Sequence, residues 1–191
     1  MTSKVFMCYD LSMKDVSNAR KISIIGPCGS GKSFLAQKLG EILNLPVHHL
    51  DSYYHKPNGE RETSEFITNK VKEIIRTEKW IIDGTYNKTL ADRFLHSDIV
   101  IYLDFEQDFC VKSVKERHTK TERLGVPEYF APTDESLNYM ISFHIAEKHP
   151  KIKTEFIIPL VEKYKDKVLT FITRKQVNDF INKNIACQWF W

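Results

Sequence analysis

Cysteine is scarce in this chain of 191 residues, and long apolar runs and a strong net charge are missing. The four cysteines, Cys8, Cys28, Cys110 and Cys187, show neither C-x-x-C spacing nor disulfide density, which favours a reducing compartment. No apolar run is long enough to span a membrane, and the N-terminus lacks the apolar core of a signal peptide. Lys plus Arg number 28 against 25 Asp plus Glu, an excess too small to indicate a nucleic-acid surface. These absences predict a soluble cytoplasmic protein without a membrane or nucleic-acid partner.

One glycine-rich segment stands out in the rest of the chain. Residues 26–33 read Gly-Pro-Cys-Gly-Ser-Gly-Lys-Ser and satisfy G-x-x-x-x-G-K-[ST], the phosphate-binding P-loop. The isoleucine-rich segment 22–25 precedes it and is typical of a buried parallel strand. Leu35, Leu39 and Ile42 follow at helical spacing. Because strand, spacing and helix agree, the motif predicts a nucleoside triphosphate site and not an incidental turn.

Each residue type in this motif has a chemical role. The glycines permit positive φ angles that turn backbone N–H groups inward, toward a polyphosphate at the start of the helix. Lys32 adds a positive charge for the outer phosphates, and the Ser33 hydroxyl is a Mg²⁺ ligand. Cys28 is mainly a spacer, although its place near a helix N-terminus predicts a lowered thiol pKa. The expected ATP-binding residues are Gly26, Cys28, Gly29, Ser30, Gly31, Lys32, Ser33 and Phe34.

Strand and helix patterns alternate along the chain, which fits one α/β domain with a parallel sheet. The predicted strands are 21–26, 46–51, 80–84, 99–104 and 168–172. Helices are predicted after the P-loop, from Thr63 or Ser64 to about 75, around 90–94, over 106–121, over 134–165 and around 177–181. Residues 52–62 are predicted to form a loop. Pro150 and Pro159 are expected to break or kink the helical region 134–165.

Acidic residues end three of the predicted strands, at the edge where open α/β sheets bind ligands. Asp83 ends the third predicted strand, so we expect it to hold Mg²⁺ through water together with Ser33, in the Walker-B manner. Asp51 is expected to hold an acceptor hydroxyl, act as a general base or orient a water; the alternative is a helix-cap or turn aspartate. Asp104 also ends a predicted strand, but its support as a site residue is weaker.

Arginine side chains offer planar, permanently charged forks for phosphate. Arg117 and Arg123 are the candidates near the end of the predicted helix 106–121, although bases there also suit the helix dipole of a solvated face. Tyr54, in the loop after the second strand, is a candidate acceptor contact. Tyr53 and Trp80 are further candidates for stacking on a base or sugar, although aromatic residues near strand ends more often pack in the core.

Three landmarks together resemble one family: the P-loop, His49-Leu50-Asp51 and the segment 80–86, Trp-Ile-Ile-Asp-Gly-Thr-Tyr. They resemble the adenylate-kinase-like P-loop kinases, most closely the FlaR-type group called DNA topology modulation proteins. The resemblance spans about residues 21–182. It implies a three-layer fold with a five-stranded parallel sheet in the order 2-3-1-4-5, an acceptor region after the second strand and a mobile lid after the fourth.

The resemblance also sets the expected boundaries of the domain and indicates which arginine takes the place of the family's acceptor arginine. We expect an N-terminal extension (1–20), a kinase domain (21–184) with a short helical lid (about 117–133), and an aromatic tail (185–191). Adenylate kinases follow the Asp-Gly of the third strand with an aromatic residue, a proline and an arginine that holds the acceptor phosphate. Here Thr85-Tyr86-Asn87 follows, so the arginine is absent, and Arg93 is the expected substitute.

The leading hypothesis is therefore a kinase that uses ATP and Mg²⁺ to phosphorylate a small acceptor, a nucleoside monophosphate or a nucleoside. Lys32, Asp51, Arg117 and Arg123 are the expected catalytic residues, and Asp51, Tyr54, Asp83 and Arg93 the expected substrate contacts. One alternative is a kinase of a hydroxylated metabolite bound through Asp51. Another is a nucleotide-responsive module with weak ATPase activity that regulates a partner or DNA. A monomer and a homodimer both remain open.

Overall fold

The computed structural model describes residues 16–54, 60–118 and 133–186. Arg123, most of the expected lid, residues 1–15 and residues 187–191 of the tail lie outside these ranges. No helix within them is long and apolar enough to cross a membrane.

Five parallel strands form one sheet in the order β2-β3-β1-β4-β5. They are β1 (Lys21–Ile25), β2 (Val47–His49), β3 (Trp80–Asp83), β4 (Ile99–Leu103) and β5 (Val168–Phe171). The P-loop strand β1 is central, and its Ile24 lies opposite Asp83 of β3. This arrangement confirms the predicted α/β fold class and strand order, and it places the ends of β1, β3 and β4 side by side.

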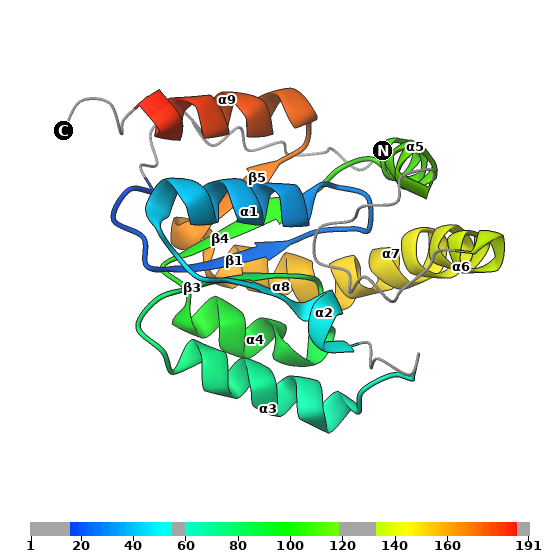
Figure 1. Ribbon diagram of the computed structural model, residues 1–191, viewed down its shortest axis with the longest axis horizontal. Coiled ribbons are helices and arrows are strands. Elements are labelled where there is room, and N and C mark those ends of the chain that lie inside the picture. Colours follow the sequence, from blue (N-terminus) through cyan, green and yellow to red (C-terminus); the bar gives the residue numbers. More distant parts are fainter. Residues whose placement is uncertain (1–15, 55–59, 119–132, 187–191) are drawn as a thin grey trace.

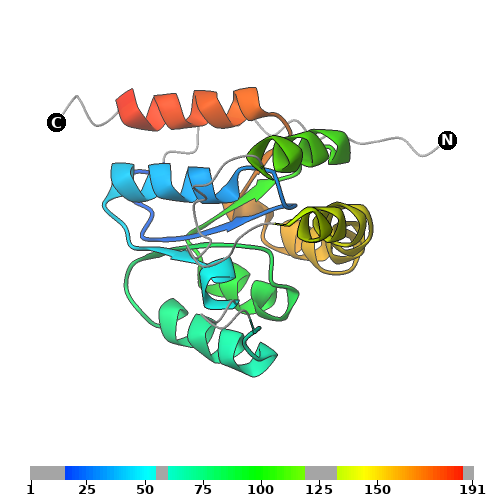
Figure 2. The ribbon, with the colours of Figure 1, turned by 45° about the vertical axis from the view of Figure 1, so that its right-hand side comes forward.

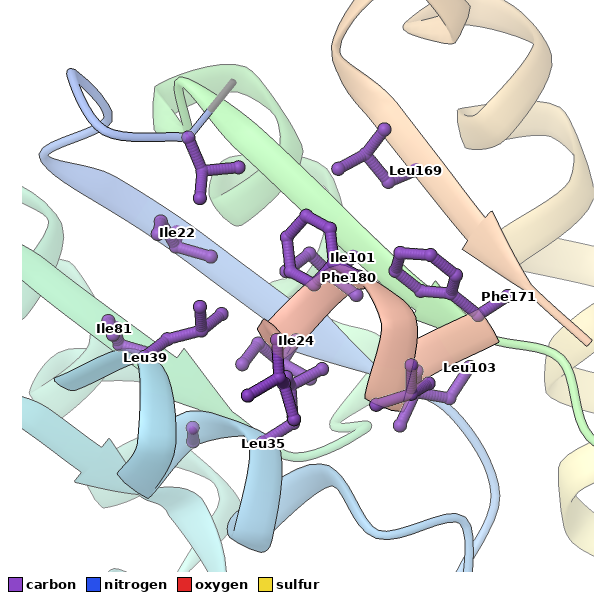
Figure 3. Close-up of a cluster of buried hydrophobic side chains, with 14 of the residues drawn as sticks. Ile22, Ile24, Leu35, Leu39, Ile81, Ile101, Leu103, Leu169, Phe171 and Phe180 are labelled. Carbon is purple, nitrogen blue, oxygen red and sulfur yellow. The ribbon is translucent and has the colours of Figure 1, made fainter. Parts of the chain in front are cut away.

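Helices α1 (Lys32–Leu43), α5 (Gln107–His118) and α9 (Arg174–Ala186) cover one face of the sheet (Figures 1 and 2). Their apolar side chains meet those of four strands in the largest buried cluster. Figure 3 shows Leu35 and Leu39 of α1 and Phe180 of α9 packed against the strands. Val16 is fully buried in the same cluster, so the segment just before β1 also packs on the domain.

The opposite face is covered by α3 (Ser64–Ile75), α4 (Asn87–His96) and a long helical region (Figure 1). Thr63 begins α3 as predicted, because its side chain accepts a hydrogen bond from the Phe66 N–H at 3.1 Å. Phe94 of α4 packs with Val100 of β4 and Ile157 of the helical region. The sheet is therefore buried on both faces, as its apolar strands predict.

The helical region over residues 134–163 is continuous, and we call it the arm helix. It comprises α6 (Asp134–Tyr139), the π-helical η1 (Met140–Lys148), α7 (His149–Ile152), the π-helical η2 (Lys153–Ile157) and α8 (Ile158–Lys163); a 3₁₀ turn, η3 (Lys165–Lys167), leads on to β5. The expected breaks at Pro150 and Pro159 do not occur. Each proline instead follows a π-helical segment, whose wider turn accommodates a residue without an N–H.

The second predicted strand is shorter than expected. β2 ends at His49, and Leu50 begins a short helix, α2 (Leu50–Tyr54), in part of the predicted loop. Leu50 is buried against Trp80 and Ile82, so its apolar side chain turns the chain inward at this point. Asp51 consequently lies in the first turn of a helix and not at the end of a strand.

Candidate active site

The P-loop glycines adopt the conformations that the motif requires. Gly26, Gly29 and Gly31 have φ angles of 150°, 83° and 89°, which L-amino acids with side chains rarely adopt. A Cβ atom at Gly29 would also clash with the carbonyl of Cys110 in α5. The loop thus lies close against α5, and its conformation depends on glycine.

One carbonyl group organises the centre of the loop. The Pro27 oxygen accepts hydrogen bonds from the Ser30 N–H (3.3 Å), the Ser30 Oγ (2.8 Å) and the Lys32 Nζ (2.8 Å). The ammonium group of Lys32 therefore folds back over the loop. Ser33 is partly exposed in the first turn of α1, and the Phe34 side chain is 48% exposed beside it. Among the expected ATP-binding residues, Gly26 and Ser30 are buried, whereas the others are at least partly exposed; their contact with ATP stays a prediction.

Asp83 lies at the end of β3, directly beside the P-loop strand. Its carboxylate is buried, and Oδ2 lies 3.0 Å from Nδ1 of His49. This hydrogen bond raises the pKa of His49 above its ordinary value, although burial of the ring acts in the opposite direction. Asp83 therefore has the position expected of a Walker-B acid. The hydrogen bond from His49 fixes the orientation of its carboxylate.

The oxygen groups of Ser33 and Asp83 fit Mg²⁺ by their chemistry, since both are hard ligands. In the described parts of the chain, no group of three or more His, Cys, Asp or Glu side chains could hold a metal ion. Mg²⁺ in phosphoryl-transfer sites is typically bound by one or two protein groups, with waters and substrate phosphates as the other ligands. The site fits a Mg²⁺ ion that arrives with a nucleotide better than a resident metal.

Cys28 lies at the meeting point of charged groups from four segments. Burial raises its thiol pKa, the charges of Lys32, Arg117 and Lys148 lower it, and the charge of Asp51 raises it. Burial dominates, so the expected lowering of the Cys28 pKa is wrong, and the thiol stays protonated at neutral pH. The same influences indicate that one carboxylate and three cations lie near Cys28.

Asp51 reaches this site from the first turn of α2. Its side chain is largely exposed, and its charge also raises the pKa of His49, so the carboxylate lies between the P-loop and the end of β2. Tyr54 is half-buried at the end of the same helix, and the Arg61 guanidinium lies over its ring, 5.6 Å from the centroid. Asp51 thus lies near the P-loop, and the roles of Asp51 and Tyr54 as acceptor contacts stay predictions.

Arg117 lies in the last turn of α5 and packs against the arm helix, with Nη2 4.0 Å from Sδ of Met140. Its charge lowers the thiol pKa of Cys28, so Arg117 lies near the P-loop, and its catalytic role stays a prediction. Arg123, the other predicted lid arginine, belongs to the residues outside the described ranges.

The position of Arg93 differs from the one expected. Its side chain is fully buried in α4, where Nη1 donates to the Gly84 carbonyl at 2.6 Å and Nη2 to the Ile82 carbonyl at 3.0 Å. Burial lowers its pKa to about 10, so the group remains charged at neutral pH. The guanidinium thus binds the backbone at the end of β3, and its buried Nε has no hydrogen-bond partner among the described residues. Its complete burial differs from the open position expected of a phosphate ligand, and its role as an acceptor contact stays a prediction.

Three further candidates also have structural partners. Trp80 is fully buried in the core. The Tyr53 hydroxyl lies 2.9 Å from Nδ1 of His48. Asp104 accepts hydrogen bonds from Lys153 Nζ at 2.6 and 2.8 Å and from the Tyr102 hydroxyl at 2.8 Å. These contacts account for Trp80, Tyr53 and Asp104 without a substrate.

The arm helix supplies site residues that the sequence reasoning missed. Lys148 lies near enough to Cys28 for its charge to lower the thiol pKa, and Lys153 forms an ion pair with Asp104, which directly follows β4. His149 lies close enough to Lys32 for that charge to contribute, with burial as the main cause, to lowering its pKa to about 4. No motif marks these residues. The signal available in the sequence was the presence of Pro150 and Pro159 inside a helical pattern, because a π turn can accommodate a proline and π turns are frequent at functional sites.

Comparisons with known proteins agree with this architecture at the level of the fold. No family model and no curated protein sequence matches the chain. The structure is similar to shikimate kinase from Acinetobacter baumannii in complex with shikimate, with a TM-score of 0.53, 14% identity and coverage of 91% of this chain and 95% of that one.

Two further solved structures give the same result. A gluconokinase from Sinorhizobium meliloti has a TM-score of 0.53 and 12% identity, with coverage of 87% of this chain and 90% of that one. Shikimate kinase from Bacteroides thetaiotaomicron has a TM-score of 0.50 and 16% identity, with coverage of 90% and 99%. At these identities the comparisons establish the fold alone: the chain has the α/β fold of the P-loop small-molecule kinases.

Proposed function

We propose that this protein is an ATP-dependent phosphotransferase that moves the γ-phosphoryl group to a small acceptor. The observation that carries the proposal is the P-loop conformation, with positive φ angles at Gly26, Gly29 and Gly31, beside the buried Asp83 at the end of the neighbouring strand β3. The charges of Lys32, Asp51, Arg117 and Lys148 also influence the thiol pKa of Cys28 in this loop. Phosphoryl transfer requires positioned substrates and positive charge around the transferred group, and little other chemistry from the protein.

The donor half of the site binds the triphosphate. The backbone N–H groups of the P-loop and the N-terminus of α1 face the phosphates. Lys32 exchanges the neutral Pro27 carbonyl for a phosphate oxygen, which is the stronger partner because it is charged. During transfer, Arg117 and Lys148, which belong to the acceptor half of the site, stabilise the charge that spreads over the γ-phosphate oxygens.

Ser33 and Asp83 would hold Mg²⁺ with the nucleotide, Asp83 through a bound water. When bound, the ion neutralises phosphate charge and orients the β- and γ-phosphates. His49 keeps the Asp83 carboxylate in one orientation through the 3.0 Å hydrogen bond. The histidine thereby reduces the reorganisation needed when the nucleotide arrives.

Asp51 acts on the acceptor. Its carboxylate holds an acceptor hydroxyl and takes its proton while that oxygen attacks the γ-phosphorus and the bond to the ADP oxygen breaks. A nucleoside or nucleoside monophosphate is the first candidate acceptor, on the resemblance to the adenylate-kinase-like, FlaR-type kinases. With a monophosphate acceptor, Asp51 orients the substrate and does not remove a proton.

A hydroxylated metabolite that is not a nucleotide is the second candidate acceptor. The burial of Arg93 favours it, because the arginine expected to hold a nucleotide's phosphate binds the backbone instead. The similar structures named shikimate kinase and gluconokinase point in the same direction. The acceptor's chemistry therefore decides between two versions of one reaction.

The test is ADP formation from Mg-ATP, measured with the protein alone and with a panel of nucleosides, nucleoside monophosphates and hydroxylated metabolites. Lys32→Ala is the inactive variant, and Lys38→Ala is the matched control, because Lys38 lies on the same helix in a surface pair with Glu41. We expect one acceptor class to stimulate turnover in the wild type and in Lys38→Ala, and not in Lys32→Ala. ATP binding without stimulation by any acceptor would contradict the kinase proposal and favour a nucleotide-responsive binding module.

A further inference from the structure

The Thr85 hydroxyl contacts both polar backbone groups of Gly26, the first residue of the P-loop. Oγ1 of Thr85 accepts a hydrogen bond from the Gly26 N–H at 2.9 Å and donates one to the Gly26 carbonyl at 2.7 Å. The two residues are 59 positions apart in the sequence. One side chain thus links the loop after β3 to the start of the P-loop through two hydrogen bonds. We call this pair of hydrogen bonds the Thr85 clasp.

The clasp lies where the backbone pairing of the sheet ends. β1 and β3 are in register up to Ile24 and Asp83, and the Gly84 N–H donates to the Ile24 carbonyl at 3.1 Å. Beyond this point Gly26 has a φ of 150°, and the two chains separate. The Thr85 hydroxyl takes the place of a neighbouring strand's backbone for one more residue, so that both Gly26 groups keep a hydrogen-bond partner.

The loop that carries Thr85 is itself held from several directions. Arg93 donates to the Ile82 and Gly84 carbonyls on its buried side. The hydroxyl of Tyr86 lies 2.7 Å from Oγ of Ser64 at the start of α3. A hydroxyl group on a fixed loop can orient its partner, whereas one on an unrestrained loop would move with it.

We propose that Thr85 is a positioning residue for nucleotide binding, which fixes the orientation of Gly26 and with it the entry of the P-loop. The P-loop binds phosphate through the directions of its backbone N–H groups, so a rotation at its first residue misaligns those that follow. The clasp also connects the P-loop to the loop that follows Asp83 at the end of β3. The inference rests on the proposed function only in requiring that the protein bind Mg-ATP.

The experiment compares Thr85→Val with Thr85→Ser. Valine keeps the branched shape and removes both hydrogen bonds, whereas serine keeps the hydroxyl and removes only a methyl group. The Kd of Mg-ATP is measured by calorimetry, together with the KM for ATP and for the acceptor once one is known. We expect Thr85→Val to raise the Kd and the KM for ATP about tenfold, Thr85→Ser to stay within about twofold of the wild type, and the acceptor KM to change little in both.

The outcomes separate this inference from the proposed function. A wild type that does not bind Mg-ATP refutes the proposed function itself. A wild type that binds, with a Thr85→Val variant of lower thermal stability but equal Kd, assigns Thr85 a structural role only and overturns the inference. So does a serine variant as weak as the valine variant, because the hydroxyl would then not be the cause.

A second measurement uses the unmodified protein, in case Thr85→Val does not fold. The clasp predicts that the Gly26 amide exchanges its hydrogen slowly without nucleotide, although it lies beyond the last residue of β1. Exchange of Gly26 is followed by NMR and compared with that of Gly31, also in the P-loop. Exchange at Gly26 as fast as that of an exposed loop amide would refute the clasp.

Discussion

The donor half and the acceptor half of the site are built in different ways. In the donor half, the functional groups belong to eight consecutive residues, Gly26–Ser33, and local backbone conformation positions them. In the acceptor half, Asp51, Arg117 and Lys148 come from α2, α5 and η1, and tertiary packing brings them to the same place. The donor half is a property of a segment, whereas the acceptor half is a property of the whole fold.

This difference has a functional meaning. A local motif keeps its chemistry when other parts of the chain change, so ATP binding can persist while the acceptor changes. An acceptor site assembled from separate helices can change its specificity through one helix at a time. The following predictions test whether the two halves can be separated by mutation.

The largest expected effect is that of Asp51→Asn. With a hydroxyl acceptor, loss of the carboxylate removes the group that binds and deprotonates the acceptor, so kcat should fall about 10³-fold, while the Kd of Mg-ATP stays unchanged. Steady-state kinetics and calorimetry provide the two values. The matched control is Asp179→Asn, which removes a carboxylate paired with Lys175 on α9 and should leave both values unchanged. Weaker ATP binding in Asp51→Asn would show that the halves are not independent.

Arg93→Met tests the support beneath the acceptor half. The change leaves the Ile82 and Gly84 carbonyls without their buried donors, so the free energy of unfolding should fall by about 3 kcal/mol. Urea unfolding measures it, with the exposed Arg76→Met as a control expected within about 0.5 kcal/mol of the wild type. An unchanged stability with a raised KM for the acceptor would instead support the original interpretation of Arg93 as an acceptor ligand.

Lys148→Met tests whether the arm helix belongs to the site. The Lys148 charge reaches the P-loop at Cys28, so its loss should lower kcat/KM about tenfold. Lys151→Met, on the same helix and also exposed, should have no effect. Equal effects of the two changes would mean that only the net charge of the arm helix matters.

The smallest effect concerns the pH dependence of stability. The pKa of His149 is lowered to about 4 by burial and by Lys32, so the unfolded chain binds a proton that the folded protein does not. Stability should therefore fall as the pH drops below about 6.5. In urea unfolding at pH 7 and pH 5, His149→Gln should reduce this loss by up to about 1 kcal/mol, since the side chain is only partly buried.

Three other histidines define the background of that experiment, and one of them is His48, whose pKa is lowered mainly by burial. The pKa of His144 is also lowered to about 4, so part of the loss should remain in His149→Gln. His49 acts in the opposite direction, because its pKa is raised: its contribution is present below about 6.5 and is lost at higher pH. A stability that rises on acidification in both proteins would contradict the assignment of His149 as a neutral, buried group.

Local sequence was sufficient for the fold class and for the P-loop conformation. Strand and helix periods, the capping residue Thr63 and the glycine spacing all act over a few residues, and their predictions agree with the structure. The predictions failed where distant contacts decide. Leu50 starts a helix because it packs on Trp80 and Ile82, and this moves Asp51 from a strand end into a helical turn.

The same reason accounts for the errors at the candidate site. Arginine at position 93 has the right chemistry for phosphate, but only the fold reveals that two backbone carbonyls occupy its donors. The low pKa expected for Cys28 ignored burial, which outweighs its three neighbouring cations. Lys148 and His149 were missed because their proximity to the P-loop depends on the packing of the arm helix.

The π turns of the arm helix have a consequence for how this region can evolve. In η1 and η2, N–H groups reach back five residues, as from His149 to His144 and from Ile158 to Lys153. A π turn corresponds to one residue more than an α turn, so each shifts the rotational phase of all side chains beyond it. Lys148 can thereby lie near the P-loop while Ile157 is buried in the core. A one-residue deletion here would re-aim one end of the helix, offering a simple route to a different acceptor.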